Sequence, residues 1–213
     1  MGTQYKQVLF DKMPVVGILR NVSLNVIEAI LPYYKKAGFT TLEITMNSEN
    51  ACEIIRKLSS DNPDINIGAG TVCTMTDLKK AIAAGASFIV TPVLDKEVVN
   101  QCTKENIPIF PGAYTPLEIY NANNLGATAV KIFPATQLGP GYVKDVLAPL
   151  PNLKLLPTGG VSVDNIASFF KVGAVGVGMG SSLFDKVLIA NNDYDGLFQH
   201  FKKIAKEVIN AKQ

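Results

Sequence analysis

The chain has 213 residues, 47% of them hydrophobic, and this length suits one α/β barrel, so we expect a single domain over residues 1–213. The formal net charge is only +2 and the basic residues are scattered, which argues against nucleic acid as a partner. No apolar run approaches 18 residues and the first twelve residues lack a signal-peptide core, so we expect a cytoplasmic protein without a membrane span.

Apolar periodicity predicts strands that alternate with helices eight times. The expected strands are residues 15–19, 41–46, 65–70, 88–90, 107–110, 129–134, 153–156 and 175–179. We expect helices between them, a short leading helix around residues 5–13 and a closing helix over 194–211. Ser23 is expected to cap the first long helix, and Pro32 to kink it.

This alternation is typical of a parallel sheet and predicts an α/β fold, a (β/α)8 TIM barrel with a short N-terminal helix. A doubly wound open sheet is the competing architecture. The chain has no GxGxxG motif after its first strand, which argues against that alternative.

A repeated glycine supports the barrel and sets a register. In four places a helix ends in glycine just before a strand, at intervals of 47, 41 and 47 residues: Gly38, Gly85, Gly126 and Gly173. The residues five positions later are Glu43, Val90, Lys131 and Gly178. Because inward side chains of alternate strands form layers in a barrel, we expect Glu43 and Lys131 in one layer on opposite walls, with Gly178 leaving room between them.

Lys131 interrupts the apolar run of residues 129–134. Burial lowers the pKa of a lysine, and a neutral amine in a dry pocket attacks ketones. Glu43 would then serve as general acid and base. Two bland alternatives remain open at this point: a lysine on a sheet edge with its amine in solvent, and a satisfied buried ion pair with Glu43.

Glycine-rich turns follow the last two expected strands, at residues 157–161 and 178–182. Glycine lets backbone N–H groups approach an anion, and these two loops are the usual phosphate site of such barrels. The pair therefore predicts a phosphate subsite.

Four more residues are candidates for binding substrate. Arg20 ends the first expected strand and Thr71 the third, at the edge where catalytic groups gather. The Arg20 guanidinium could bind a carboxylate or form a salt bridge on the rim. Pro92 and Phe133 could wall the pocket, although both are equally good core residues. The chain has three separated cysteines and one histidine, His200, which argues against a metal site or a histidine-based triad.

The motifs, taken in order, are Leu42-Glu43-Ile44-Thr45, Gly68-Ala69-Gly70-Thr71, Lys131-Ile132-Phe133-Pro134, Pro157-Thr158-Gly159-Gly160 and Gly180-Ser181. Over about residues 14–184 the chain resembles the bacterial class I 2-keto-3-deoxy-6-phosphogluconate / 4-hydroxy-2-oxoglutarate aldolase family. The resemblance implies a TIM barrel, usually trimeric, that needs no metal or cofactor. It also implies that Lys131 forms the Schiff base and that Glu43 shuttles protons. The binding residues it implies are Thr71 and an arginine for the pyruvate end, and Gly159, Gly160, Gly180 and Ser181 for phosphate.

One motif departs from the phosphogluconate enzymes, many of which carry Thr-Leu-Arg-Thr after the glutamate. Here the sequence is Thr45-Met46-Asn47-Ser48, which, together with Arg20 and the run Leu138-Gly139-Pro140, is similar to the 2-keto-3-deoxy-6-phosphogalactonate aldolases. Arg20 would then bind the substrate carboxylate. The two substrates differ in stereochemistry at C4, and both remain open from the sequence.

The expected function is therefore reversible cleavage of a phosphorylated 2-keto-3-deoxy sugar acid to pyruvate and D-glyceraldehyde 3-phosphate, with 4-hydroxy-2-oxoglutarate as a further substrate. Two alternatives use the same residues. One is a phosphosugar isomerase or epimerase on the same barrel, with Glu43 as the base and no imine. The other is a sensor that binds a phosphorylated metabolite without turnover.

Overall fold

The computed structural model describes residues 4–212 and shows short parallel strands alternating with helices. The strands are β1 (Val15–Leu19), β2 (Thr41–Thr45), β3 (Asn66–Gly70), β4 (Ile89–Val90), β5 (Ile109–Phe110), β6 (Gly112–Ala113), β7 (Val130–Ile132), β8 (Leu155–Pro157) and β9 (Val177–Met179). The helices are α1 (Gln7–Lys12), α2 (Leu24–Lys36), α3 (Ala51–Asp61), α4 (Met75–Ala83), α5 (Lys96–Lys104), α6 (Pro116–Asn124), α7 (Gly139–Leu147), α8 (Ile166–Lys171), α9 (Lys186–Ala190) and α10 (Tyr194–Ala211).

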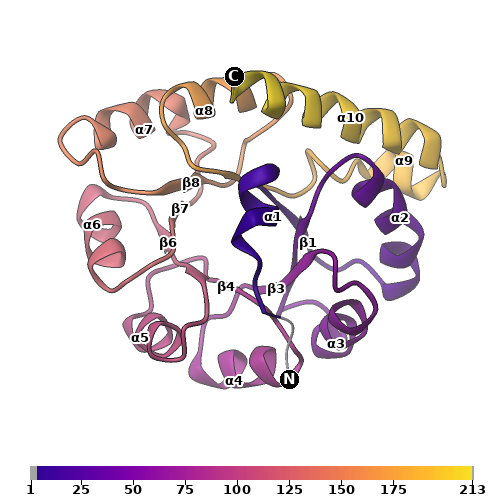
Figure 1. The fold of residues 1–213 in the computed structure, drawn as a ribbon, viewed down its shortest axis with the longest axis horizontal. Coiled ribbons are helices and arrows are strands. Elements are labelled where there is room, and N and C mark those ends of the chain that lie inside the picture. Colours follow the sequence, from indigo (N-terminus) through magenta and orange to yellow (C-terminus); the bar gives the residue numbers. More distant parts are fainter. Residues whose placement is uncertain (1–3, 213) are drawn as a thin grey trace.

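The strands close into a barrel surrounded by the helices, as the sequence predicts (Figure 1). One sheet has the order β5-β4-β3-β2-β1-β9 and the other β6-β7-β8. Pro111 alone separates β5 from β6, and a parallel bridge between Thr158 and Gly178 joins β8 to β9. The barrel thus has eight strand positions, and β5 and β6 together occupy the fifth. This order puts β2 and β7 on opposite walls.

Several local expectations need correction. The fifth expected strand, residues 107–110, is shortened to Ile109–Phe110, and a further strand, β6, follows Pro111, which has no N–H to give to the ladder. Ser23 occupies the N-cap position of α2 without a capping hydrogen bond from its side chain. Pro32 lies inside α2, which extends to Lys36, and the kink at Pro32 stays a prediction. Helix α9 was not expected from the sequence: it has only five residues, its apolar residues 187–190 form an unbroken run too short to show a helical period, and it begins at the side-chain cap of Asp185.

The four repeated glycines behave as expected. Gly38, Gly85, Gly126 and Gly173 have φ values of 98°, 93°, 92° and 101°. This left-handed conformation ends each helix at little steric cost only in glycine. The same local device therefore sets the start of β2, β4, β7 and β9, and with it their register.

The register places Glu43 and Lys131 inside the barrel. Glu43 pairs with Ile18 of β1, and Lys131 with Leu156 of β8. Gly178 leaves room that the side chain of Thr158 uses, since a Cβ there would lie 2.3 Å from Oγ1 of Thr158. Gly70 makes room for the side chain of Glu43, because a Cβ on Gly70 would lie 1.5 Å from Oε1 of Glu43.

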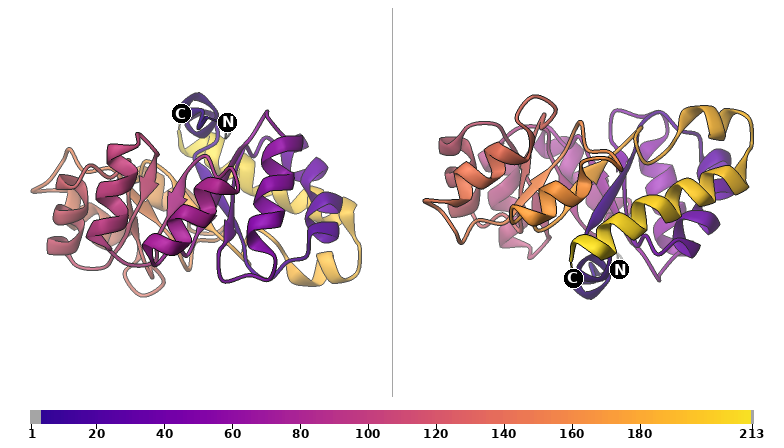
Figure 2. Two further views of the ribbon diagram at one scale, coloured as in Figure 1. Left: turned by 90° about the horizontal axis from the view of Figure 1, so that it is seen from below. Right: turned by 90° about the horizontal axis from the view of Figure 1, so that it is seen from above.

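The amino end of the barrel is closed by aromatic side chains. The ring centroids of Phe88 and Phe110 are 5.8 Å apart, and Phe10 of α1 lies 6.0 Å from Phe110. Helix α1 (indigo) lies over the middle of the barrel in Figure 1 and stands out from one end in Figure 2. Substrate access from that end is therefore blocked.

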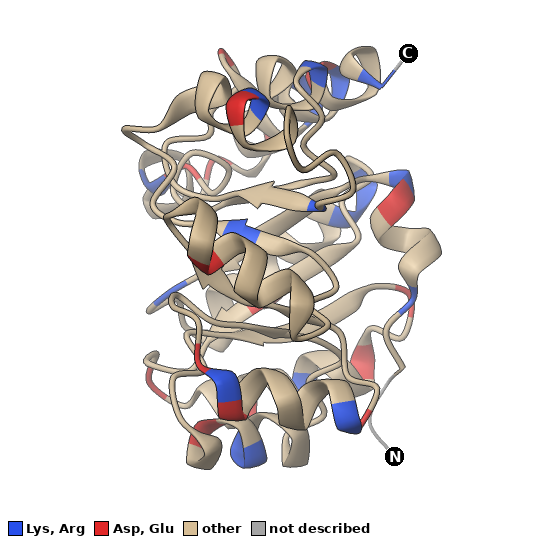
Figure 3. Cartoon of the chain, turned by 90° about the vertical axis from the view of Figure 1, so that its left-hand side faces the viewer, with Lys and Arg blue, Asp and Glu red and all other residues tan. Residues whose placement is uncertain are grey.

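The outer helices carry basic and acidic residues intermixed, as Figure 3 shows for one side of the molecule. Such a surface does not create the one-sided field that nucleic-acid binding requires. Among residues 4–212, no helix is both long and apolar enough to cross a bilayer.

Candidate active site

The predicted site residues come together at the carboxyl end of the barrel. They follow, or lie within, seven of the strands. Arg20 follows β1, Glu43 lies in β2, Thr71 follows β3, Pro92 lies just beyond β4, Lys131 lies in β7 with Phe133 after it, Gly159 and Gly160 lie beyond β8, and Gly180 and Ser181 follow β9. Parallel strands in a closed barrel bring these strand ends together at one end of the barrel, where barrel enzymes carry their active sites.

Lys131 is buried, with 6% of its surface exposed. Burial lowers the pKa of its amine, and the nearby Arg20 charge lowers it further, against an opposing effect of Glu43. Nζ lies 4.8 Å from the ring centroid of Phe133. The sheet-edge alternative, with the amine in solvent, is therefore not what the structure shows.

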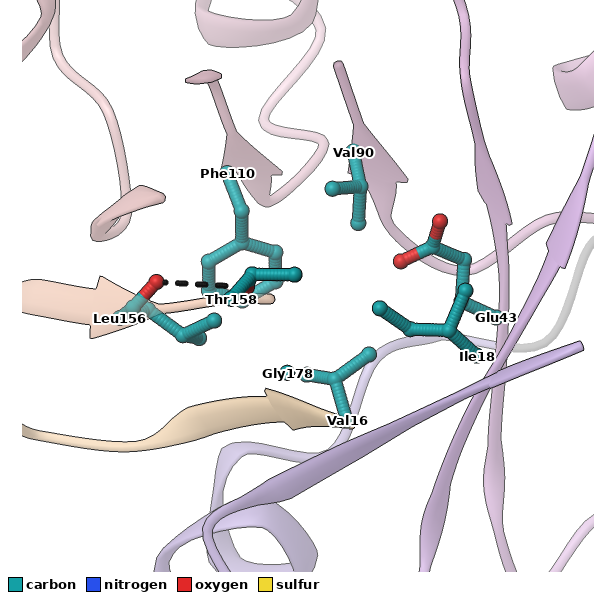
Figure 4. A pocket seen from close by; sticks show the side chains of 8 residues that line it. All are labelled: Val16, Ile18, Glu43, Val90, Phe110, Leu156, Thr158 and Gly178. Atoms are coloured by element: carbon teal, nitrogen blue, oxygen red, sulfur yellow. Dashed lines mark hydrogen bonds between the residues drawn. The ribbon is translucent and has the colours of Figure 1, made fainter. Parts of the chain in front are cut away.

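Glu43 is 1% exposed and points into the barrel interior beside Ile18 and Val90 (Figure 4). Burial raises the pKa of its carboxyl, while the charges of Lys131 and Arg20 act in the opposite direction. Its Oε2 is buried without a hydrogen-bond partner in the described part of the chain. An unpaired buried acceptor lowers the stability of the fold, so this carboxyl is a candidate for a functional group that interacts with a ligand.

The two groups do not form a salt bridge. Within residues 4–212, ion pairs closer than 4.0 Å join Lys35 to Asp64 and Lys57 to Asp61, both at the surface. The satisfied buried pair considered from the sequence is thus absent there. Lys131 and Glu43 each act on the pKa of the other through space, without a direct ion pair.

Arg20 is exposed at the rim, and its charge acts on both Glu43 and Lys131. The next residue, Asn21, has a φ of 54° and donates its backbone N–H to Oγ of Ser48 over 2.9 Å. Ser48 Oγ also lies 2.9 Å from Oγ1 of Thr45, in β2. Ser48 thus fixes the loop that carries Arg20 relative to the strand that carries Glu43.

Thr71 has a φ of 56°, a left-handed conformation that is a clear outlier for a β-branched residue. Such strain costs on the order of 1–3 kcal/mol and is concentrated at ligand-binding and catalytic positions. The strained backbone turns the chain directly after β3 and places Thr71, half-buried, at the mouth of the barrel. The sequence indicates the residue by its position, whereas the strain is visible only in the structure.

Pro92 and Phe133 are half-buried at the same rim. The carbonyl oxygen of Pro92 lies 2.2 Å from where a Cβ of Gly112 would be, so only glycine fits on the neighbouring strand. Phe133 presents its ring to the amine of Lys131. Of the two, Phe133 is therefore the one in direct contact with a predicted functional group.

The two glycine-rich turns present backbone donors to solvent. Gly159 and Gly160 have φ values of 92° and 73°, and a Cβ on Gly160 would lie 2.7 Å from Cα of Thr136. Among the described residues, the N–H groups of Gly160, Gly180 and Ser181 donate no hydrogen bond. Backbone N–H groups that are free in this way are able to donate to an anion.

A model of the family described as KDPG and KHG aldolase matches residues 7–200. The chain belongs to this family. A 2-dehydro-3-deoxy-phosphogluconate aldolase from Haemophilus influenzae is 35% identical over 208 residues, which are 96% of each chain. A solved structure described as native KDPGal matches with a TM-score of 0.88 at 29% identity and covers 99% of both chains. A KDPG aldolase from Legionella pneumophila, with pyruvate captured as a covalent carbinolamine, matches with a TM-score of 0.85 at 26% identity over 92% of this chain and 96% of that one.

Three residues of this family member were not selected from the sequence as part of the site. Gly70 makes room for Glu43, Thr158 fills the space beside Gly178, and Ser48 supports the Arg20 loop. Gly70 could have been found from the barrel rule alone, because the layer above Glu43 comes from the odd-numbered strands. The other two depend on side-chain directions that the sequence does not indicate. No group of three or more potential metal ligands occurs within residues 4–212.

Proposed function

We propose that the protein is a class I aldolase that reversibly cleaves a 2-keto-3-deoxy-6-phospho sugar acid to pyruvate and D-glyceraldehyde 3-phosphate. The observation that carries the proposal is a barrel lysine, Lys131, that is buried and has a lowered pKa. Such an amine is neutral, and therefore nucleophilic, over a wider pH range than an exposed lysine. The same reaction would convert 4-hydroxy-2-oxoglutarate to pyruvate and glyoxylate.

Lys131 forms the imine in this proposal. Its neutral amine adds to the C2 carbonyl of the substrate, and the carbinolamine loses water to give an iminium ion. The C3–C4 bond then breaks, its electron pair moves into the iminium to form an enamine, and the aldehyde leaves. The carbinolamine in the Legionella pneumophila relative supports an imine route for this family.

Glu43 carries the protons. It accepts the proton of the C4 hydroxyl as the C3–C4 bond breaks, and returns a proton to C3 of the enamine. Water then hydrolyses the pyruvate imine. The raised pKa of Glu43 suits this role, because a carboxyl that titrates nearer neutral pH both accepts and releases protons.

The remaining residues bind the substrate. Arg20 and Thr71 hold the carboxylate of the pyruvate end, with Arg20 donating from its guanidinium fork. Pro92 and Phe133 wall the pocket. The phosphate binds to the turns after β8 and β9 through Gly159, Gly160, Gly180 and Ser181, and the free N–H groups there support this assignment.

We further propose a homotrimer in the cytoplasm. Exposed apolar side chains on neighbouring segments support self-association: Val93 is 58% exposed and Leu117 69%, with Tyr114 and Tyr120 beside them on the chain. Three unpaired cysteines, one of them exposed, fit a reducing compartment. Sedimentation of the wild type and of Leu117→Asp tests the assembly, and a wild type that sediments as a monomer would rule it out.

Pyruvate release tests the function directly. The protein is mixed with each 2-keto-3-deoxy-6-phospho acid, the gluconate and the galactonate form, and pyruvate is followed with lactate dehydrogenase and NADH. Turnover is expected with one or both substrates, and the ratio of the two rates assigns the C4 preference. A sensor would bind these ligands without releasing pyruvate. An isomerase or epimerase would consume them without releasing pyruvate.

A further inference from the structure

Two hydrogen bonds connect helix α10 to both glycine-rich turns. Nε2 of His200 lies 2.9 Å from the carbonyl oxygen of Ser182, and Oγ of Ser182 donates to the carbonyl oxygen of Val161 over 2.6 Å. A carbonyl oxygen only accepts, so His200 donates from Nε2. The connection runs from α10 to the turn after β9, and from there to the turn after β8.

The turn that contains Ser182 is fixed on both sides. The N–H groups of Leu183 and Phe184 donate to the carbonyl of Gly180 over 3.0 Å and 2.9 Å, which closes the turn. The Ser182 carbonyl and the Leu183 N–H belong to one planar peptide unit, and both are bonded. The hydrogen bond from His200, on α10, therefore fixes the orientation of that peptide plane.

The turn after β8 is held in a similar way. Asn165 donates from Nδ2 to the carbonyl of Gly160 over 2.8 Å and accepts the N–H of Ser162 over 2.9 Å. These bonds shape that turn internally. Only the hydroxyl of Ser182 ties it to the turn after β9 among the side-chain hydrogen bonds of the described residues.

We propose that Ser182 and His200 are positioning residues for the phosphate subsite, and this rests on the proposed function. Neither side chain touches the phosphate. They hold the free N–H groups of Gly160 and Ser181 at a fixed separation, so that both donate to one phosphate group. The imine chemistry at Lys131 lies on other strands and does not depend on this tie.

The proposal predicts that binding and imine chemistry separate. Inorganic phosphate is titrated into the full-length wild type and Ser182→Ala by calorimetry, and exchange of the pyruvate methyl protons with D2O is followed by NMR. Exchange requires the imine and the enamine but no phosphate. In Ser182→Ala, the Kd for phosphate and the KM for the phosphorylated substrate rise about fivefold, the equivalent of one neutral hydrogen bond. The pyruvate exchange rate stays within about twofold.

Conservative variants and a matched control sharpen the test. Ser182→Thr keeps a hydroxyl and restores phosphate affinity, and His200→Gln keeps a donor near the position of Nε2, whereas His200→Phe weakens phosphate binding as Ser182→Ala does. Ser59→Ala is the control, because its hydroxyl is buried with no partner among the described residues, and it leaves the phosphate Kd unchanged.

Three results would overturn the proposal. Ser182→Ala could bind phosphate as the wild type does. Pyruvate exchange could fall together with phosphate affinity, which would mean that the bonds maintain the whole barrel end. A wild type that binds no phosphate would refute the phosphate subsite itself, and the positioning role with it. A wild type that binds phosphate, with the same Kd in Ser182→Ala, would refute only the positioning role.

Discussion

The two ends of the barrel interior follow the same strand alternation but treat polar groups in opposite ways. At the amino end, Phe10, Phe88 and Phe110 pack ring against ring in a cluster of apolar side chains. Toward the carboxyl end, Lys131 and Glu43 are buried, and among the described residues they form no ion pair and Oε2 of Glu43 has no hydrogen-bond partner. Burying such groups costs free energy, which the apolar end must offset. Stability and function are thus separated along the barrel axis.

The largest effect is expected for Lys131→Ala. The variant should fold, because it removes a buried charge-bearing group, but pyruvate release should fall to the uncatalysed background for want of the amine that forms the imine. Lys154→Ala, at an exposed lysine just before β8, is the matched control and should keep wild-type turnover. Retained turnover in Lys131→Ala would show that Lys131 is not the amine that forms the imine.

Next in size is Glu43→Gln, which keeps the shape of the side chain and removes its proton chemistry. We expect kcat to fall about 10²- to 10⁴-fold, the usual contribution of a general acid and base. Steady-state pyruvate release measures this, with circular dichroism to establish that the barrel is intact. Normal kcat in a folded variant would assign the proton transfers to another group.

Phe88→Ala probes the opposite end. Phe88 is fully buried between Tyr5 and Phe110, so its truncation should cost about 3–5 kcal/mol of unfolding free energy. Per folded molecule, kcat should change little, because Phe88 is not one of the residues that we place in contact with substrate. Urea unfolding together with kinetics below the transition distinguishes the two effects. A loss of kcat comparable with that of Glu43→Gln would show that stability and function are not divided between the two ends of the barrel.

The smallest effect concerns pH and stability. Burial raises the folded-state pKa of Glu43, so between the ordinary value of 4.5 and that raised pKa the folded protein binds more protons than the unfolded chain. The wild type therefore loses stability as pH rises through this window. The loss in the wild type amounts to about 1.4 kcal/mol of unfolding free energy for each unit by which the pKa is raised. Glu43→Gln cannot titrate at this position and does not show the loss.

Urea unfolding at a series of pH values measures this difference. The stability advantage of Glu43→Gln should be smallest near pH 4.5, grow as pH rises, and level off above the folded-state pKa of Glu43. An advantage that shrinks with rising pH would mean that the carboxylate is stabilised by its surroundings.

Much of the fold and the placement of the central pair could be predicted because the signals are local and repeated. The helix-ending glycines recur before four strands, and counting from them puts Glu43 and Lys131 inside the barrel. What escaped prediction depends on tertiary contacts. Thr158 fills the space beside Gly178, and Ser182 meets His200 across 18 residues of chain.

Helix α9 escaped for a different reason. It has five residues, and its apolar residues 187–190 form an unbroken run, so the segment is too short to show the helical period on which sequence interpretation depends. Its start is decided by Asp185, whose carboxylate accepts the N–H groups of Val187 and Leu188. Such a cap is easily recognised in the structure, but in the sequence many aspartates that lie in loops look the same as one that caps a helix.

The central claim is that Lys131 is the amine that reacts, and borohydride reduction in the presence of pyruvate tests it most directly. The reduced adduct should appear on the peptide that carries Lys131, with loss of activity in proportion to labelling. Lys131→Ala should take up no label, and Lys154→Ala should label as the wild type does. An adduct on another lysine, or no adduct at all while pyruvate release continues, would contradict the account.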